Sequence, residues 1–248
     1  MSAFELFYQL HHNTEPFVLA NVWNVESARM AEQAGFKAIA TSSGAVANSL
    51  GYADGEQIPF GELLYIVKRI KASTGIPLTV DMERGYSDDA AVLNKNVQTL
   101  LDLGVAGINL EDWQGEDLYL KKLAALKDYL EKTNQRLFIN ARTDAFLLKL
   151  PSPLETTVRR AQLYKEAGAD GLFVTAIQDL ELIRQIAAGT TLPLNIVGNS
   201  KTFSASALSG CGVKRISMAV LLYKATYRGL QKFLHEIQAQ QSLSALLE

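Results

Sequence analysis

Acidic side chains follow several short apolar runs of this 248-residue chain. Asp81 and Glu83 close one run, and Glu111 closes the next. Asp54 lies in the glycine-containing segment Gly44–Pro59, which is expected to be an active-site loop rather than a packing element. Carboxylates gathered around one axis repel one another unless a cation neutralises them. Clustered oxygen ligands suit Mg²⁺, or alternatively Mn²⁺, which keep several waters and take one or two direct carboxylates. The sequence therefore predicts a metal site formed by these four carboxylates.

One cationic residue and a small polar segment complete the predicted site. Arg142 closes the apolar run that follows Glu111. A guanidinium binds a carboxylate through two parallel N–H bonds, so Arg142 is the candidate for gripping a substrate acid. Ser43 and Gly44, with Ser42, offer hydroxyl and backbone N–H groups to a second anionic group. Together these residues predict a site for a small, multiply charged acid.

Other polar or aromatic residues near the run ends have two interpretations. Trp23 and Asn195 either contact the substrate or serve packing and backbone hydrogen bonding. Asp112 and Asp144 are better explained as helix caps or loop hydrogen-bonders than as ligands. Gly198–Ser200 is better explained as a plain turn than as a phosphate-binding loop.

Eight apolar runs must position these residues. Most are rich in Val, Ile, Leu and Phe and do not alternate with polar residues, which is typical of strands buried on both faces. Stretches with helical spacing separate most of them, such as the one that carries Leu63, Val67 and Ile70. The runs are Phe17–Ala20, Ala38–Ser42, Leu78–Met82, Gly107–Glu111, Leu137–Ala141, Gly171–Thr175, Leu192–Val197 and Arg215–Val220.

Alternating strands and helices predict a parallel sheet. Eight units in 248 residues match a single closed (β/α)8 barrel spanning residues 1–248. The alternative, an open doubly wound sheet, usually carries a Gly-rich phosphate loop after its first strand, and none is present here. A barrel builds its active site at the carboxyl ends of its strands, which is where the acids and Arg142 fall.

Composition excludes several other classes of protein. With 24 basic and 26 acidic residues and 48% hydrophobic content, the chain is neither disordered nor a basic nucleic-acid binder. It has no apolar run long enough to span a membrane, and its first residues do not resemble a signal peptide, so we expect a cytoplasmic protein. The single Cys211 rules out a disulfide framework and is expected to be a small buried hydrophobe. His11 and His12 are expected to be surface or packing residues.

Four motifs, in the same order and with similar spacing over nearly the whole chain, resemble the isocitrate lyase/phosphoenolpyruvate mutase superfamily. They are Ser43–Asp54, Val80–Tyr86, Ile108–Asp112 and Asn140–Ala145, followed by a strand-like Gly212–Ser217. The resemblance implies a (β/α)8 barrel, often with a C-terminal helix swapped between subunits of a homodimer or homotetramer. It also implies Mg²⁺-dependent chemistry on an α-keto acid or its enolate.

The resemblance also assigns roles to the candidate residues. Asp81 would bind Mg²⁺ directly, while Glu83, Glu111 and Asp54 would hold the waters of the metal. Arg142 would grip the substrate carboxylate. Ser43 and the Gly44 backbone would bind the keto-acid end, with Trp23 packed over it.

One departure from the family pattern narrows the predicted activity. Members that cleave isocitrate or methylisocitrate carry a Lys-Lys-Cys-Gly-His-type loop after the acid that corresponds to Glu111. Here a helix is expected almost at once after Glu111, and neither Cys nor His occurs before Arg142. This disfavours those two activities, and it also weighs against chemistry that needs a gating loop to close over the substrate. Lys121 and Lys122 are expected on the exposed face of that helix.

The specific hypothesis is a lyase or hydrolase that breaks a C–C bond in a small α-keto or 2-hydroxy dicarboxylate. Arg142, Glu111 and Asp54 are its expected catalytic residues. The alternatives are phosphonate P–C chemistry and a non-catalytic metabolite-binding relative. A Schiff-base aldolase is disfavoured, because no Lys lies in the C-terminal half of any expected strand. The apolar segment Leu221–Phe233 is expected to pack against a partner subunit.

Overall fold

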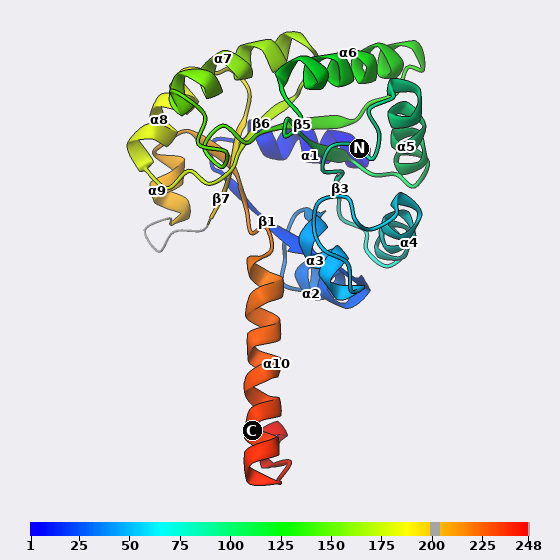
Figure 1. Cartoon of the computed structure of the whole chain (residues 1–248), viewed down its shortest axis with the longest axis vertical. Helices are drawn as coiled ribbons and strands as arrows, with labels where there is room; N and C mark the ends of the chain where they lie inside the picture. Colours follow the sequence, from blue (N-terminus) through cyan, green and yellow to red (C-terminus); the bar gives the residue numbers. More distant parts are fainter. Residues whose placement is uncertain (199–203, 248) are drawn as a thin grey trace.

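The computed structural model, which describes residues 1–198 and 204–247, contains a closed barrel of eight parallel strands (Figure 1). The strands pair in chain order, and β8 pairs with β1. This confirms the predicted (β/α)8 barrel. The strands are β1 (Phe17–Val22), β2 (Ile39–Thr41), β3 (Leu78–Asp81), β4 (Gly107–Glu111), β5 (Phe138–Thr143), β6 (Gly171–Val174), β7 (Leu194–Val197) and β8 (Val213–Ser217).

Helices connect and cover the strands, and their ends carry ordinary capping chemistry. The Asp89 carboxylate accepts from the backbone N–H groups of Ala91 and Val92 at the start of α5, and Gly104, just past its end, adopts a φ of 74°. The helices are α1 (Ala3–His12), α2 (Val25–Gln33), α3 (Ser43–Ser49), α4 (Phe60–Lys71), α5 (Ala90–Asp102), α6 (Glu116–Lys132), α7 (Pro153–Glu166), α8 (Leu180–Ala188), α9 (Ala205–Ser209), α10 (Leu221–Gln240) and the 3-10 turn η1 (Ser244–Leu246).

The main apolar core lies between the barrel and the helices around it. Side chains such as Leu63, Val67 and Leu123 are fully buried there, as the helical spacing predicts. A smaller core cluster joins α1 to the barrel, where Phe7 packs edge to face against Phe138. His11 is also buried in this cluster, and its Nδ1 bonds the Phe7 carbonyl at 2.8 Å. It is therefore a packing residue, whereas His12 is exposed.

Strand register brings the predicted site residues to one end of the barrel. Glu111 of β4 lies beside Arg142 of β5, and Asp81 of β3 lies beside Asn109 of β4. Because all eight strands are parallel, their carboxyl ends meet at the same rim. The acids that are far apart in the sequence are therefore neighbours in space.

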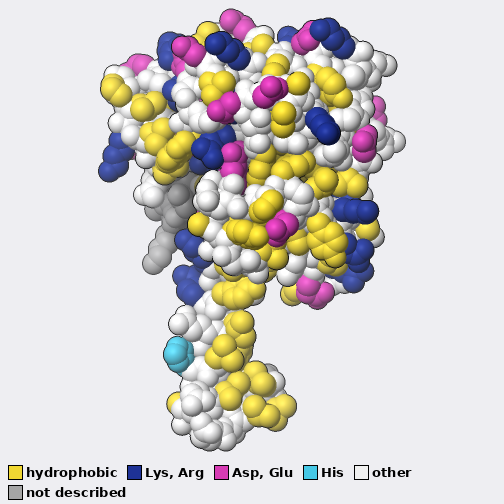
Figure 2. All heavy atoms as spheres, turned by 45° about the vertical axis from the view of Figure 1, so that its right-hand side comes forward, with side chains coloured by type: hydrophobic (Ala, Val, Ile, Leu, Met, Phe, Trp, Pro, Cys, Tyr) yellow, Lys and Arg dark blue, Asp and Glu magenta, His cyan; other side chains and the backbone are white. Residues whose placement is uncertain are grey.

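The C-terminal helix α10 projects from the barrel (Figure 1). None of its 20 residues, all of them described, is buried. Hydrophobic side chains gather along one side of the projecting segment (Figure 2), including Tyr227, Leu230 and Phe233. In the described part of the chain, no helix has both the length and the apolar content that crossing a membrane requires.

Three expectations from the sequence need correction or a limit. The eighth strand begins at Val213 rather than Arg215 and ends at Ser217. The segment Gly44–Pro59 was expected to be a loop, but α3 occupies its first part, because Gly44 to Ala47 are small enough to be buried there. The expected turn Gly198–Ser200 lies outside the described residues from position 199 onward.

Candidate active site at the carboxyl rim of the barrel

Two cavities, each of about 400 Å³, meet at the carboxyl rim of the barrel. Both are lined by Ser43, Asp54, Arg142 and Leu147. The inner cavity also reaches Gly44, Asp81, Asn109, Phe173 and Ser217. The outer cavity also reaches Gly55, Glu83, Arg84, Glu111 and Trp113. All four predicted metal-site carboxylates and Arg142 thus line one continuous region.

Asp81 is held at the end of β3 by two hydroxyl groups of the neighbouring strand end. Its backbone N–H donates to Thr41 Oγ1 at 2.9 Å, and Ser43 Oγ donates to Asp81 Oδ2 at 3.0 Å. Burial raises the pKa of the Asp81 carboxyl, while the Arg142 charge and the Ser43 hydrogen bond oppose that rise. Asp81 is therefore a rigidly placed carboxylate that pays a desolvation penalty for its charge.

Glu83 has a backbone conformation that residues other than glycine rarely adopt. Its φ is 48°, and two of the next three residues, Gly85 and Tyr86, also have positive φ values of 100° and 60°. Glu83 Oε2 accepts from the Glu56 backbone N–H at 2.7 Å. Glu83 Oε1 is buried and has no hydrogen-bond partner among the described residues. Burial, together with the charges of Asp81, Asp54 and Glu111, raises the pKa of Glu83 to about 8.

Asp54 lies against the backbone of Gly44 at the start of α3. A Cβ added at Gly44 would lie 2.8 Å from Asp54 Oδ2, which is closer than real contacts allow. The Gly44 carbonyl also accepts from Asn48 Nδ2. Glycine at position 44 is thus required for Asp54 to approach the cavity this closely.

Arg142 is oriented by carboxylates on both sides. Its Nη1 contacts Glu111 Oε2 at 2.7 Å, and its Nε contacts Asp144 Oδ1 at 2.9 Å. Asp144 Oδ1 also accepts from Thr175 Oγ1 at 2.5 Å. Burial raises the pKa of Glu111 to about 7, although the Arg142 charge opposes this rise. The guanidinium is therefore fixed at the cavity wall, where it can meet a substrate carboxylate.

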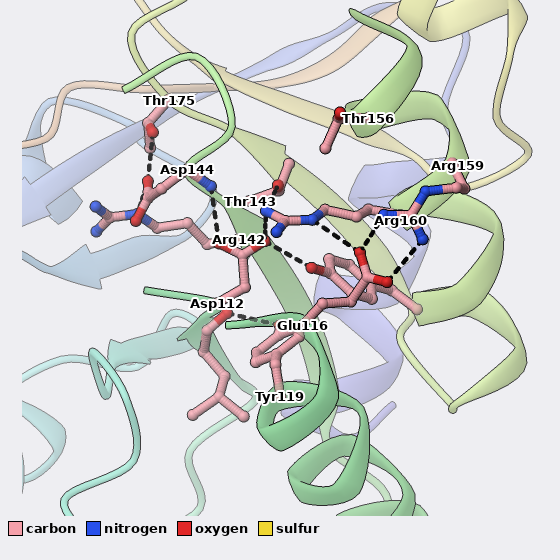
Figure 3. Close-up of polar contacts among 12 residues, drawn as sticks. Asp112, Glu116, Tyr119, Arg142, Thr143, Asp144, Thr156, Arg159, Arg160 and Thr175 are labelled. Atoms are coloured by element: carbon pink, nitrogen blue, oxygen red, sulfur yellow. Dashed lines mark hydrogen bonds and ion pairs between the residues drawn. The ribbon is translucent and has the colours of Figure 1, made fainter. Parts of the chain in front are cut away.

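A buried network supports this arginine from outside the barrel (Figure 3). Asp112 Oδ1 accepts from the Asp144 backbone N–H at 3.0 Å, and Asp112 Oδ2 accepts from Arg160 Nη1 and Tyr164 Oη, each at 2.6 Å. Glu116 at the start of α6 binds the same Arg160 through Nε at 3.1 Å. Asp112 and Asp144 are therefore loop hydrogen-bonders, as the sequence predicts, and they fix the β4 and β5 ends relative to α7.

The carboxylates fit a divalent cation, although they do not form a closed ligand cage. Among residues 1–198 and 204–247, no three His, Cys, Asp or Glu side chains converge closely enough to ligate one ion together. Mg²⁺ does not need such a cage, since it usually takes one or two carboxylates and keeps its waters. The unpartnered Glu83 Oε1 and the raised pKa values of Asp81, Glu83 and Glu111 are what a site lacking positive charge would show.

Two predicted substrate-binding residues lie elsewhere. Trp23 packs against Tyr223 and Tyr227 of α10, with ring centroids 5.2 and 6.4 Å apart, and lines a separate groove between α2 and α10. Asn195 is fully buried inside the barrel, where Asn140 Nδ2 donates to its Oδ1 at 3.0 Å and its own Nδ2 bonds Ser217 Oγ at 2.9 Å. Neither residue lines the two cavities in the described structure. The structural interpretation, packing for Trp23 and internal hydrogen bonding for Asn195, is the one that the geometry supports.

Cys211 is buried, as predicted, and lies just before β8, away from the site.

The segment between β4 and α6 contains only residues 112–115, so the structure agrees with the short connection predicted after Glu111. Trp113 in this segment is 48% exposed and lines the outer cavity. An open rim with one aromatic side chain stands where a long loop would otherwise lie.

Sequence reasoning missed Glu56 and misplaced Lys122. Glu56 binds the turn after β3 from one side: its Oε1 accepts from the Tyr86 backbone N–H at 2.8 Å, and its Oε2 pairs with Arg84 at 2.9 Å. Lys122 was expected on an exposed helix face but is only 3% exposed. Lys121, its neighbour, is exposed as expected. Helical spacing places Lys122 on the buried face of α6, because it lies three positions after Tyr119 and four before Leu126. No local sequence signal marks Glu56, whose partners are distant in sequence.

Comparison with known proteins places this geometry among related enzymes. A family model described as phosphoenolpyruvate phosphomutase matches residues 7–238. The chain is 31% identical over 208 residues to the 2-methylisocitrate lyase of Escherichia coli, and the matched region covers 78% of this chain and 68% of that enzyme. It is 32% identical over 198 residues to the oxaloacetate decarboxylase of Rhodopseudomonas palustris, covering 75% and 67% of the two chains. A crystal structure from Burkholderia cenocepacia, provisionally assigned as a phosphonomutase, matches with a TM-score of 0.88 at 33% identity, covering 94% of this chain and 98% of that one.

Proposed function

The chain belongs to the isocitrate lyase/phosphoenolpyruvate mutase superfamily of enzymes, and we propose that within it the chain is a Mg²⁺-dependent C–C lyase or hydrolase. The proposed substrate is a small α-keto or 2-hydroxy dicarboxylate, such as oxaloacetate or a substituted malate. The observation that carries the proposal is the convergence of Asp54, Asp81, Glu83 and Glu111 on cavities that also hold the fixed Arg142.

The residues of this chain have separate roles in the proposed reaction. Arg142, held between Glu111 and Asp144, would bind one carboxylate of the substrate. Ser43 and the Gly44 backbone would bind the keto-acid end beside Asp81. This geometry would align the scissile C–C bond before it breaks, so that part of the entropic barrier is removed on binding. For a 2-hydroxy acid, one of the two cavity-lining carboxylates Glu111 and Asp54 would accept the single proton of the substrate hydroxyl as that bond breaks.

Mg²⁺, or Mn²⁺ in its place, would be held directly by Asp81, with Glu83, Glu111 and Asp54 binding its waters. When bound, such a cation stabilises the negative charge that develops on the enolate oxygen. The donor set supports this assignment, because it consists of carboxylates and includes a buried carboxylate oxygen without a protein partner. Oxygen-rich sites of this kind favour hard divalent cations.

The short β4–α6 connection favours C–C cleavage over P–C chemistry. Only residues 112–115 lie there, so the chain offers no long gating loop from this segment. A closing lid excludes water from reactive intermediates, whereas an open rim admits it. The enolate formed by C–C cleavage can be protonated by water without loss of the product, and a hydrolase uses water as its second substrate. P–C bond chemistry on a phosphonate remains the second candidate and is supported by the family model and by the phosphonomutase-like relative.

The proposal includes assembly into a homodimer or homotetramer through α10. This helix buries none of its residues within the described chain, yet it exposes Tyr227, Leu230, Phe233 and Leu234. At its base, a groove of about 600 Å³ is lined largely by apolar residues such as Met30, Phe36 and Leu222. A second copy of α10 offers the matching apolar surface, so an exchange of this helix between subunits would cover both.

Binding of oxalate, a stable mimic of a two-carbon enolate, tests the proposed site. Isothermal titration should show oxalate binding in the presence of Mg²⁺ and none after EDTA treatment. Asp81→Ala should abolish the Mg²⁺-dependent binding. Equal oxalate affinity with and without Mg²⁺, or no effect of Asp81→Ala, would refute the proposed metal site.

A further inference from the structure

A buried lysine in the middle of α6 lies directly behind the active-site rim. Lys122 is 3% exposed, although it sits on a surface helix and next to the exposed Lys121. Its Nζ donates to the Arg84 carbonyl at 2.8 Å, to Asp88 Oδ1 at 2.9 Å and to Gln114 Oε1 at 2.9 Å. An ammonium group has three hydrogens to donate, so these three contacts satisfy it completely.

The three acceptors belong to the two segments that carry the site carboxylates to the rim. Arg84 and Asp88 lie in the turn that follows Glu83, and Gln114 lies in the short connection that follows Glu111. One side chain therefore ties the β3 end and the β4 end to each other and to α6. The hydrogen bond from Lys122 is also the main reason why the pKa of the Asp88 carboxyl is lowered.

The turn after β3 needs such a restraint. Glu83, Gly85 and Tyr86 all have positive φ, and for the two that are not glycine this conformation is strained. Strained backbone persists only where surrounding contacts hold it. The Glu111 backbone N–H donates to the Glu83 carbonyl at 2.8 Å. The strained Glu83 therefore lies against the end of β4, at the start of one of the two segments that Lys122 joins.

Glu56 restrains the same turn from the opposite side. It binds the Tyr86 N–H through Oε1 and Arg84 through Oε2, and its own N–H donates to Glu83 Oε2 at 2.7 Å. The turn is therefore fixed between a carboxylate at the rim and an ammonium in the helical layer. Arg84 contacts both groups, Glu56 through its guanidinium and Lys122 through its carbonyl.

A buried ammonium is costly unless it is fully paired, and an apolar residue would fill this position at lower cost. Leucine or methionine at position 122 would pack in the helical layer as Leu123 and Leu126 do, but it would not bind the two segments. The charge at position 122 is thus explained by what it holds in place rather than by packing.

We propose that Lys122 is a positioning residue that sets the strained turn after β3 and so presents the Glu83 carboxylate to the divalent cation; this rests on the proposed metal-dependent function. Lys122 does not touch the cavities and takes no part in bond breaking. It acts through the Arg84 carbonyl and the two rim segments. Groups that support metal-site residues from behind typically change metal affinity by about 10- to 100-fold when removed.

Two variants and a matched control test the proposal. Lys122→Met keeps the length and apolar packing of the side chain but removes all three hydrogen bonds. Gln114→Leu removes one of the three acceptors from an exposed loop position, together with the 3.1 Å hydrogen bond from Gln114 Nε2 to Asp88 Oδ2. It therefore tests the connection between the two rim segments with a change that is mild for the fold. Lys121→Met removes a charge from the exposed neighbouring position and serves as the control.

Direct Mn²⁺ binding and amide hydrogen exchange of residues 84–88 in the metal-free protein are the two measurements. Lys122→Met should weaken Mn²⁺ binding by at least about tenfold and speed exchange in this segment, with smaller changes in the same direction for Gln114→Leu and none for Lys121→Met. Unchanged Mn²⁺ affinity and unchanged exchange in Lys122→Met, or equal effects from Lys121→Met, would overturn the proposal. If the unaltered chain binds no Mn²⁺, the proposed function fails, and the exchange comparison still decides whether Lys122 holds the turn.

Discussion

Replacing Glu83 with glutamine should stabilise the metal-free protein at alkaline pH, although it damages the proposed site. Glu83 is only 3% exposed and lies near Asp81, Asp54 and Glu111. Its burial, together with the charges of these three carboxylates, raises its pKa from 4.5 to about 8. A carboxyl whose pKa is higher in the folded state stabilises the fold while it is protonated. That stabilisation is complete below the unfolded pKa and is lost as the pH rises through the folded pKa.

The size of this effect follows from the same values. At about 1.4 kcal/mol per pH unit, raising the pH from about 5 to about 8 should cost the folded protein on the order of 4 kcal/mol through Glu83 alone. Glutamine has a similar shape, keeps an oxygen that can accept from the Glu56 N–H, and never ionises. Glu83→Gln should therefore match the unaltered chain in unfolding free energy near pH 5 and exceed it by several kcal/mol near pH 8.

Urea unfolding in EDTA at both pH values measures the difference, with the surface change Glu131→Gln as a control. Adding Mg²⁺ at pH 8 should narrow the stability difference, because the unaltered chain gains more free energy from metal binding than Glu83→Gln does. If Glu83→Gln is no more stable than the unaltered chain at pH 8 in EDTA, the raised pKa of Glu83 does not destabilise the fold as expected. A stability difference of the same size at pH 5 and pH 8 would lead to the same conclusion.

Three further outcomes are expected. Gly44→Ala should displace Asp54, since its Cβ would lie 2.8 Å from Asp54 Oδ2, and raise the Mg²⁺ concentration needed for half-maximal activity by about tenfold; an unchanged value would argue against a role for Asp54. Arg142→Lys should raise the KM for the acid substrate by about 10- to 100-fold through loss of the paired guanidinium hydrogen bonds, whereas a change in kcat alone would contradict the binding role. Leu230→Glu combined with Phe233→Glu should reduce the mass in light scattering to that of one chain, 27.2 kDa, and an unaltered chain that is already monomeric would disprove assembly through α10.

The barrel could be predicted from the sequence because its signal is repeated eight times. Most of the buried parallel strands are apolar runs without alternation, and helical stretches separate most of them, so errors of a few residues at single ends do not change the count. The acids were predictable for a related reason. Once the strands are parallel, Asp81, Glu111 and Arg142 must reach the same rim, whatever the details of the helices.

The surroundings of the site were not predictable in the same way. The exposed-face prediction for Lys122 is wrong, because helical spacing groups it with the buried Tyr119 and Leu126 and not with Lys121. Its three acceptors, which lie 8 to 38 positions away in the sequence, could not be predicted. Glu56 is likewise tied to a turn about 30 residues further along the chain. Trp23 was assigned by family resemblance, yet in this chain the aromatic residues of α10 draw it into a separate groove. Such contacts depend on tertiary geometry that no local pattern encodes.

Product formation from a panel of oxaloacetate, substituted malates and phosphonopyruvate, followed by NMR, tests the proposed Mg²⁺-dependent C–C cleavage. We expect two carbon-containing products from at least one dicarboxylate with Mg²⁺, and neither product with EDTA or in Asp81→Ala. Cleavage that survives both EDTA and Asp81→Ala would contradict this expectation. Turnover of phosphonopyruvate with no C–C cleavage of any dicarboxylate would contradict it as well.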